Sequence, residues 1–167
     1  MVFAVESKLR LNLSGLKRLV KELEEANNTV AISGVINGDA NATDAAILNE
    51  FGGKSIYTDD PHRGEEVIVP ARSFVQKPID INAQKIIDAG VNELDFKKGS
   101  FIKSLNKMGK MASELQEKAL ETNGEGIPDW QKHNSPRTID IKGFDKPLYT
   151  RHNTTFPIDY ELQRRGA

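Results

Sequence analysis

The densest group of side chains able to support metal or acid–base chemistry lies between residues 59 and 66. Its members are Asp59, Asp60, His62, Glu65 and Glu66. Carboxylates and an imidazole are ligands for divalent ions, but a metal site needs them in a fixed geometry. This group lies in a turn-rich stretch and lacks the i, i+4 pairing that puts two ligands on one helix face. The pattern favours a solvated loop, and we predict no metal ion and no cofactor. A metal-dependent enzyme using this group is an alternative.

The remaining candidates for catalysis are His133 and His152, which flank a polar region. The chain has no cysteine, which excludes disulfides, thiolate nucleophiles and cysteine-based metal sites. No serine lies in a glycine elbow, so a nucleophilic triad has no anchor. The Gly124-Glu125-Gly126 stretch lacks the third glycine and the preceding strand of a phosphate-binding loop. We therefore predict that the chain is not an enzyme and has no catalytic residue.

Basic side chains gather in the stretch from residue 97 to residue 118. They are Lys97, Lys98, Lys103, Lys107, Lys110 and Lys118. Lysines can contact phosphates, so a nucleic-acid-binding module using the lysines at 97–118 is the alternative function. Acidic residues interrupt the group at Glu114, Glu117 and Glu121. The whole chain has 23 basic and 24 acidic residues and a net charge of −1, unlike a dedicated nucleic-acid binder. A solvated helix face is the favoured interpretation.

Apolar residues recur at helical spacing in three regions, which predicts helices over 14–26, 78–92 and about 101–119. In the last of these, Gly109 costs about 1 kcal/mol unless another backbone packs closely against it. A short helix over about 43–51 would be capped by Thr43 or Asp44 and ended by Gly52. Another short helix is predicted over about 136–142, with Ser135 as its cap and Pro136 at its first position.

Alternation of apolar and polar residues predicts strands over 29–36, 67–69 and from about residue 156 onwards. Pro157 removes a ladder donor, so the last strand should lie at a sheet edge or carry a bulge. Strands and helices do not alternate as in a wound parallel sheet. We therefore predict an α+β fold, with a small antiparallel β-sheet packed against one long helix and two or three shorter helices.

The length of 167 residues fits a single domain over 1–167. Within it we predict a long exposed loop or hairpin over 53–66 and an exposed tail over 163–167. No apolar run approaches the roughly 20 residues needed to span a membrane, so we expect no membrane partner.

Three stretches of the chain, taken in order, resemble one family. They read AILNEFGG over 46–53, VPARSFVQKP over 69–78 and NSPRTIDIKGFDKPLYT over 134–150. Their order and spacing are similar to those of the tail-completion and neck proteins of tailed phages, and the resemblance covers residues 42–160. One departure is the run Thr150-Arg151-His152-Asn153, where the family usually has an Asp-Thr-Gly turn. The positions that carry the family motifs are Asn49, Glu50, Phe51, Gly52, Pro70, Arg72, Phe74, Pro78, Asn134, Ser135, Thr138, Lys146, Pro147 and Leu148.

The resemblance implies a structural role and no reaction. Such a protein forms a ring, expected to be a hexamer, at the head–tail junction of the virion after assembly in the host cytoplasm. Its implied partners are other copies of itself, the head connector or portal side, and the tail tube. DNA passes through the lumen only as cargo.

Four motif residues also have local interpretations. We expect Phe51 to anchor a helix end in the core and Gly52 to permit the chain reversal. We expect Arg72 to pair with a carboxylate or a carbonyl, and Phe74 to pack inward.

Overall fold

The structure is a computed structural model that describes residues 13–95, 100–149 and 156–165. Its elements in chain order are α1 (Leu13–Asn27), β1 (Thr29–Val35), α2 (Ala40–Phe51), β2 (Gly53–Ile56), β3 (Glu66–Val69), α3 (Gln76–Ile81), α4 (Ala83–Asn92), α5 (Phe101–Glu121), α6 (Pro136–Lys142) and β4 (Ile158–Arg164). The predicted α+β class is confirmed. The departure at Thr150–Asn153, together with Lys97, Lys98 and His152, lies outside the described residues.

The strands form two separate antiparallel ribbons instead of one small sheet. β1 pairs with β4 from Thr29↔Arg164 to Val35↔Ile158, and β2 pairs with β3. Pro157 lies just before β4, so its missing N–H removes no bond from this ladder. β4 continues through Gln163 and Arg164, where the sequence predicts an exposed tail. Arg165 is exposed, and the last two residues lie outside the description.

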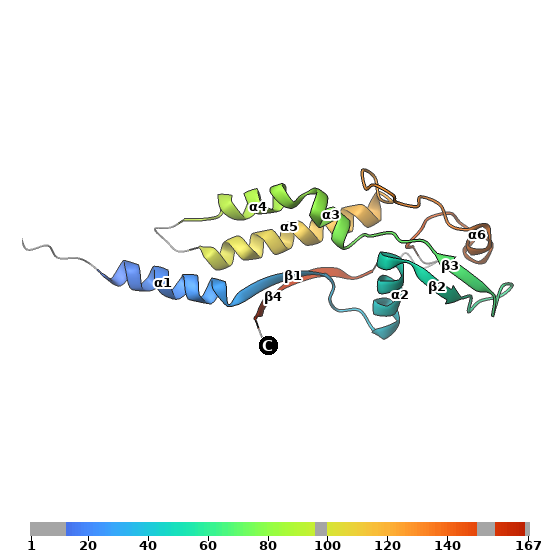
Figure 1. The fold of residues 1–167 in the computed structure, drawn as a ribbon, viewed down its shortest axis with the longest axis horizontal. Helices are drawn as coiled ribbons and strands as arrows, with labels where there is room; N and C mark the ends of the chain where they lie inside the picture. The colour runs from blue at the N-terminus through green and yellow to red at the C-terminus, as the bar shows by residue number, and fades with distance from the viewer. Residues whose placement is uncertain (1–12, 96–99, 150–155, 166–167) are drawn as a thin grey trace, which may run out of the picture.

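The long helix α5 is the centre of one half of the molecule. Figure 1 shows it running between α4 on one side and the β1–β4 ribbon on the other. The ribbon approaches the helix closely at Gly109, where an added Cβ would lie 2.6 Å from Cδ2 of Tyr160 and 3.3 Å from Cβ of Ala31. The glycine inside this predicted helix therefore has a packing reason: it makes room for the ribbon.

The helical region predicted over 78–92 is confirmed, but a break at Asn82 divides it into two helices. α3 ends at Ile81 and α4 begins at Ala83, with Asn82 between them at φ −116° and ψ 16°. The Asn82 side chain donates from Nδ2 to the carbonyl of Pro78 at 2.9 Å. A short polar side chain that bonds the backbone four residues back competes with helix continuation.

The N-terminal cap of α2 also differs from the prediction. α2 begins earlier than expected, and neither Thr43 nor Asp44 is its cap. Asp39 takes that role, because its carboxylate accepts a hydrogen bond from the Ala42 N–H at 2.8 Å. The predicted caps of α6 are confirmed: Ser135 accepts from the Thr138 N–H, and Pro136 opens the helix.

The hydrophobic core is small and lies where α2, the end of α5 and the following loop meet. Its buried members are Ala46, Phe74, Leu120 and Trp130. Phe74 is fully buried and stacks on Phe156, with ring centroids 5.0 Å apart and planes 12° from parallel. The prediction that Phe74 packs inward is confirmed. None of the helices in the described ranges is long and apolar enough to cross a membrane.

The second half of the molecule is the β2–β3 hairpin with α6. Figure 1 shows this hairpin and α6 at one end of an elongated molecule and α1 at the other. The predicted segment 53–66 supplies β2, the hairpin tip and the first residue of β3. The tip is closed by hydrogen bonds from the Tyr57 N–H to the Glu65 carbonyl and from the Gly64 N–H to the Tyr57 carbonyl.

Candidate assembly interface

The first two motif stretches meet at Glu50, whose side chain points from α2 into the molecule and is only 7% exposed. Its carboxylate accepts hydrogen bonds from the Ser73 hydroxyl at 2.5 Å, the Val75 N–H at 2.8 Å and the Gln76 N–H at 3.1 Å. The two amides belong to the start of α3, where unpaired N–H groups favour an anion. Glu50 therefore joins α2 to α3.

Arg72 joins the same region to the third motif stretch. It is 5% exposed, and its guanidinium donates from Nε to the Gln131 carbonyl at 2.9 Å and from Nη2 to the His133 carbonyl at 3.0 Å. The expectation that Arg72 pairs with a carbonyl is confirmed. Burial lowers the pKa of Arg72 from its ordinary value, and the negative charge of Asp145 partly offsets that effect. The backbone N–H of Arg72 also donates to the Asn49 carbonyl at 2.6 Å.

Asp145 organises the start of the third stretch. One carboxylate oxygen accepts from the Asn134 N–H at 2.7 Å, and the other lies 2.7 Å from Nδ1 of His133. These contacts hold the pKa of Asp145 below its ordinary value, the backbone hydrogen bond from Asn134 contributing most. His133, a candidate in the sequence, therefore pairs with a carboxylate next to α6.

The remaining motif residues of this stretch also have structural roles. Pro147 is fully buried, and Leu148 packs against the core cluster. Lys146 places its ammonium 3.4 Å from the centroid of the Tyr149 ring, a cation–π contact. The Lys146 carbonyl accepts from Lys142 at 2.7 Å. The stretch is thus held in place by its own side chains.

Two prolines, one asparagine and one glycine are further motif residues whose positions the structure shows. Pro78 is buried within α3, whereas Pro70 is exposed after β3. Asn49 donates from Nδ2 to the Ala45 carbonyl one turn earlier in α2, at 2.8 Å. Gly52 ends α2 at φ +71°, and an added Cβ there would lie 2.8 Å from the Ala71 backbone nitrogen. The expectation that Gly52 permits the reversal is confirmed.

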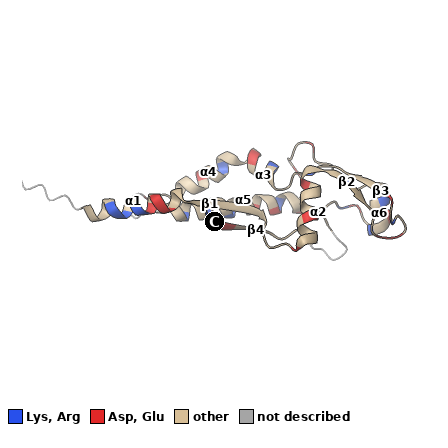
Figure 2. Cartoon of the chain, turned by 60° about the horizontal axis from the view of Figure 1, so that its bottom comes forward, with Lys and Arg blue, Asp and Glu red and all other residues tan. Residues whose placement is uncertain are grey.

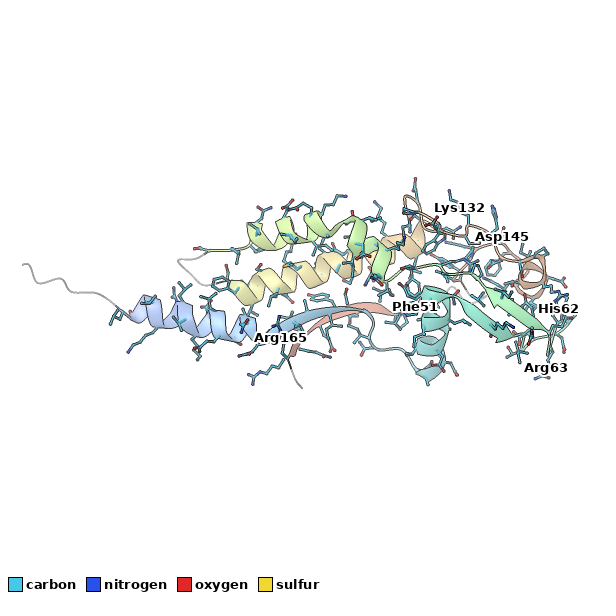
Figure 3. The ribbon with its side chains drawn as sticks, viewed as in Figure 1. Phe51, His62, Arg63, Lys132, Asp145 and Arg165 are labelled. Atoms are coloured by element: carbon cyan, nitrogen blue, oxygen red, sulfur yellow. The ribbon has the colours of Figure 1, made fainter. Side chains whose placement is uncertain are left out.

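The expected role of Phe51 as a core anchor is wrong. Phe51 is 71% exposed, and Figure 3 labels it on α2. The buried side of α2 carries Ala46 and Glu50, four residues apart. Phe51 follows Glu50 by one residue, about 100° around the helix, on the same side as exposed Ile47. The helix therefore presents two large apolar side chains to the outside.

Two members of the group at 59–66, His62 and Glu65, connect the hairpin to α6. His62 lies 3.2 Å from Glu65 through Nδ1 and 3.2 Å from Asp140 of α6 through Nε2. Glu65 also pairs with Arg137 of α6 at 2.7 Å. Among the described residues, no group of three histidine or acidic side chains is placed to hold a metal ion. Figure 3 shows His62 and Arg63 at the hairpin end of the molecule.

Tyr57 adds a second link between the hairpin and α6. Its hydroxyl shares hydrogen bonds with Ser135 at 3.0 Å and with Thr138 at 3.1 Å. The motif residues Ser135 and Thr138 are thus both the capping pair of α6 and its contact with the hairpin. No local pattern in the sequence indicates this contact, because Tyr57 lies 78 residues before Ser135.

The four described lysines of the alternative function do not form an isolated basic surface on α5. Lys103, Lys107, Lys110 and Lys118 are exposed, but Lys110 lies 3.8 Å from Glu114 on the same helix. Figure 2 shows basic and acidic segments interspersed along the described chain. Mixed charge of this kind is typical of a solvated helix face.

Large apolar side chains are exposed on several elements. Twelve are exposed among the described residues, whereas seven hydrophobic residues are buried and three of these are alanine. Single exposed apolar side chains are common on protein surfaces, whereas a contiguous set of them is typical of interaction sites. The most regular set lies on α1, which has no buried residue and exposes Leu13, Leu16, Val20 and Leu23.

A second apolar surface lies beside α2. A pocket of about 300 Å³ is bordered by Val35, Thr43, Ala46, Ile47, Glu50, Phe51, Val75 and Gln76. Ile47 and Phe51 stand at its exposed border, and Glu50 holds α3 against its other side. The described residues thus expose two separate apolar surfaces, one on α1 and one beside α2. Comparison of the chain with models of known protein families, with curated proteins and with solved structures finds no match.

Proposed function

We propose that this chain is a structural virion protein of a tailed phage that forms a ring at the head–tail junction. In this role of tail completion, or neck formation, it joins the head connector to the tail tube around the DNA channel. It acts without a cofactor and is not an enzyme. It assembles in the host cytoplasm and ends in the virion.

The observation that carries the proposal is the excess of exposed over buried large apolar side chains. Twelve large hydrophobic residues are exposed in the described part of a chain whose core cluster has four buried members. A monomer that buries so little has reason to bury more by association. The three ordered stretches that resemble tail-completion proteins name the kind of assembly, a ring of identical subunits.

The motif residues support the proposal as a rigid framework. Glu50, Arg72 and Asp145 are each held by two or three hydrogen bonds or ion pairs, which link α2, α3 and the segment before α6. A ring closes only if every copy presents the same two patches at the same angle. The side chains of Glu50 and Arg72 are buried, whereas the contacts of Asp145 are exposed. A scaffold fixed by buried polar side chains of the first kind provides that constancy, because such networks specify one arrangement.

The near-neutral charge agrees with DNA as cargo. Tight DNA binding depends on many lysines and arginines that release counterions, and this chain has a net charge of −1. A channel subunit that bound DNA strongly would hinder its passage.

Native mass spectrometry of the purified chain and cryo-microscopy of purified particles test the proposal. We expect a closed oligomer, with six copies as the leading stoichiometry, and density for this chain between head and tail. A strict monomer at high concentration, together with absence of the chain from particles, would refute it.

A nucleic-acid-binding module using the lysines at 97–118 is the alternative, and the exposure of the four described lysines on α5 favours it. It predicts DNA affinity that falls steeply as salt increases. No binding to DNA at low salt would exclude this alternative.

A further inference from the structure

Four exposed apolar residues form a stripe along α1: Leu13, Leu16, Val20 and Leu23. This α1 stripe is not the face by which α1 packs on its own chain. The half-buried residues of α1 are Leu19, Glu22 and Ala26, which share one face. Val20, 45% exposed, lies about 100° around the helix from Leu19, and Leu16 beside it is 56% exposed. An amphipathic helix is expected to bury its apolar stripe. Of the large apolar residues of α1, only Leu19, at one edge of the apolar surface, is half-buried, and the other four are exposed.

The α1 stripe cannot reach the α2 pocket of its own chain. β1 lies between the two helices in the chain, followed by four residues before α2, and its seven residues are paired with β4 along their whole length. A strand of that length spans about 23 Å, so α1 and α2 are held at its two ends. Figure 1 shows α1 extending away from the rest of the molecule on the far side of β1 from α2. Any contact between the stripe and the pocket therefore joins two copies.

The two surfaces also have complementary charge. Lys17, Lys21 and Glu24 are exposed and each follow a stripe residue by one position, so this flank of the stripe is basic in its first turns and acidic at its end. Figure 2 shows the basic part of α1 further from β1 than its acidic part. Next to the pocket lining, Asp44 follows Thr43 in α2 and Asp80 lies four residues after Gln76 in α3, and both aspartates are exposed. The single basic residue of these two helices, Lys77, is half-buried.

We infer that the apolar stripe of α1 (Leu13, Leu16, Val20 and Leu23) docks in the pocket beside α2 of a second copy of this chain, against Ile47 and Phe51. The inference rests on the proposed function and names the contact between neighbouring subunits. An amphipathic helix laid in an apolar groove uses anchors three and four residues apart, and the stripe residues follow one another at these spacings. Because stripe and pocket are different surfaces, the contact is head-to-tail and can close into a ring.

Cysteine cross-linking tests this contact cleanly, since the chain contains no cysteine. The variants Val20→Cys and Phe51→Cys are made separately in the 167-residue chain and mixed under mild oxidation. We expect a covalent dimer in the mixture and little dimer in either variant alone. The matched control is Glu25→Cys, an exposed position on the opposite side of α1, which should cross-link to Phe51→Cys much more weakly.

The double variant Val20→Cys/Phe51→Cys extends the test to the whole assembly. Head-to-tail contact predicts a ladder of covalent oligomers that ends at the mass of the ring. The single variant Val20→Asp should weaken self-association at least about tenfold, because it puts a charge into the apolar contact. Circular dichroism should remain unchanged, since Val20 is half-exposed within the monomer.

The possible failures are distinguishable. A dimer of Val20→Cys with itself would show that α1 pairs with α1 and would overturn the inference. A ring in native mass spectrometry without a cross-link between positions 20 and 51 would refute the inference and leave the proposed function standing. A strict monomer in every variant and in the unmodified chain would refute both.

Discussion

Glu50 of α2 accepts a hydrogen bond from the backbone N–H of Val75 at 2.8 Å, directly before α3. The carboxylate is buried, and it serves the Gln76 N–H and the Ser73 hydroxyl as well. One acidic side chain thus takes the place of a local helix cap, although 25 residues separate it from the amide that it binds. This link positions the wall of the α2 pocket that faces Phe51.

Replacing Glu50 with Gln should destabilise the chain. Glutamine keeps one acceptor oxygen but puts a donor NH₂ where the carboxylate accepts, so at least one buried N–H loses its partner. We expect a loss of about 1–3 kcal/mol in the free energy of unfolding, measured by urea denaturation. Glu66→Gln, at an exposed position of β3, is the control and should change stability by less than about 0.5 kcal/mol. Equal effects of the two substitutions would contradict the role assigned to Glu50.

Replacing Gly109 with Ala should destabilise the chain although alanine favours helices. The new Cβ would lie 2.6 Å from the Tyr160 ring, so β4 must move away from α5. Overpacking of this kind costs about 1–3 kcal/mol, more than the gain of about 1 kcal/mol in helix propensity. Gly15→Ala in α1 is the matched control, because nothing lies within 4 Å of its Cβ. That control should raise the thermal midpoint, whereas Gly109→Ala should lower it.

Replacing Arg72 with Lys should test whether its geometry or its charge matters. Arg72 donates two hydrogen bonds to two carbonyls, and lysine has a single ammonium that cannot reproduce this fork. We expect a loss of about 1–3 kcal/mol in the free energy of unfolding, since at least one carbonyl loses its charged donor. Arg63→Lys at the exposed hairpin tip serves as the reference and should be nearly neutral. A neutral Arg72→Lys would show that charge alone suffices.

The contribution of Asp145 should depend on pH. Its pKa in the folded chain is below the ordinary value of 3.8, chiefly through the hydrogen bond from Asn134. A carboxyl group whose pKa is lowered by folding stabilises the fold above its unfolded pKa and loses that effect as pH falls through its folded pKa. The difference in stability between the unmodified chain and Asp145→Asn should be constant at about pH 6 and above, and should shrink below about pH 4. Thermal unfolding from about pH 2 to about pH 7 would measure it, and a difference that grows on acidification would contradict the assignment.

Some features follow from local sequence alone. The apolar spacing from Phe101 to Ala119 predicts α5 because a long amphipathic run has few alternatives. Ser135 followed by Pro136 predicts the start of α6 because both act on their own first turn. The absence of cysteine and the balance of charge also exclude classes of chemistry without any knowledge of the fold.

Other features depend on contacts between distant segments, and only the tertiary structure decides them. Thr29 pairs with Arg164 across most of the chain, and no local pattern records that pairing. The direction of Phe51 follows from which side of α2 the core occupies, and the exposure of the α1 stripe follows from which face β1 and α5 leave free. Residue type and spacing determine which elements form, whereas long-range packing determines which of their apolar faces are buried and which remain for a partner.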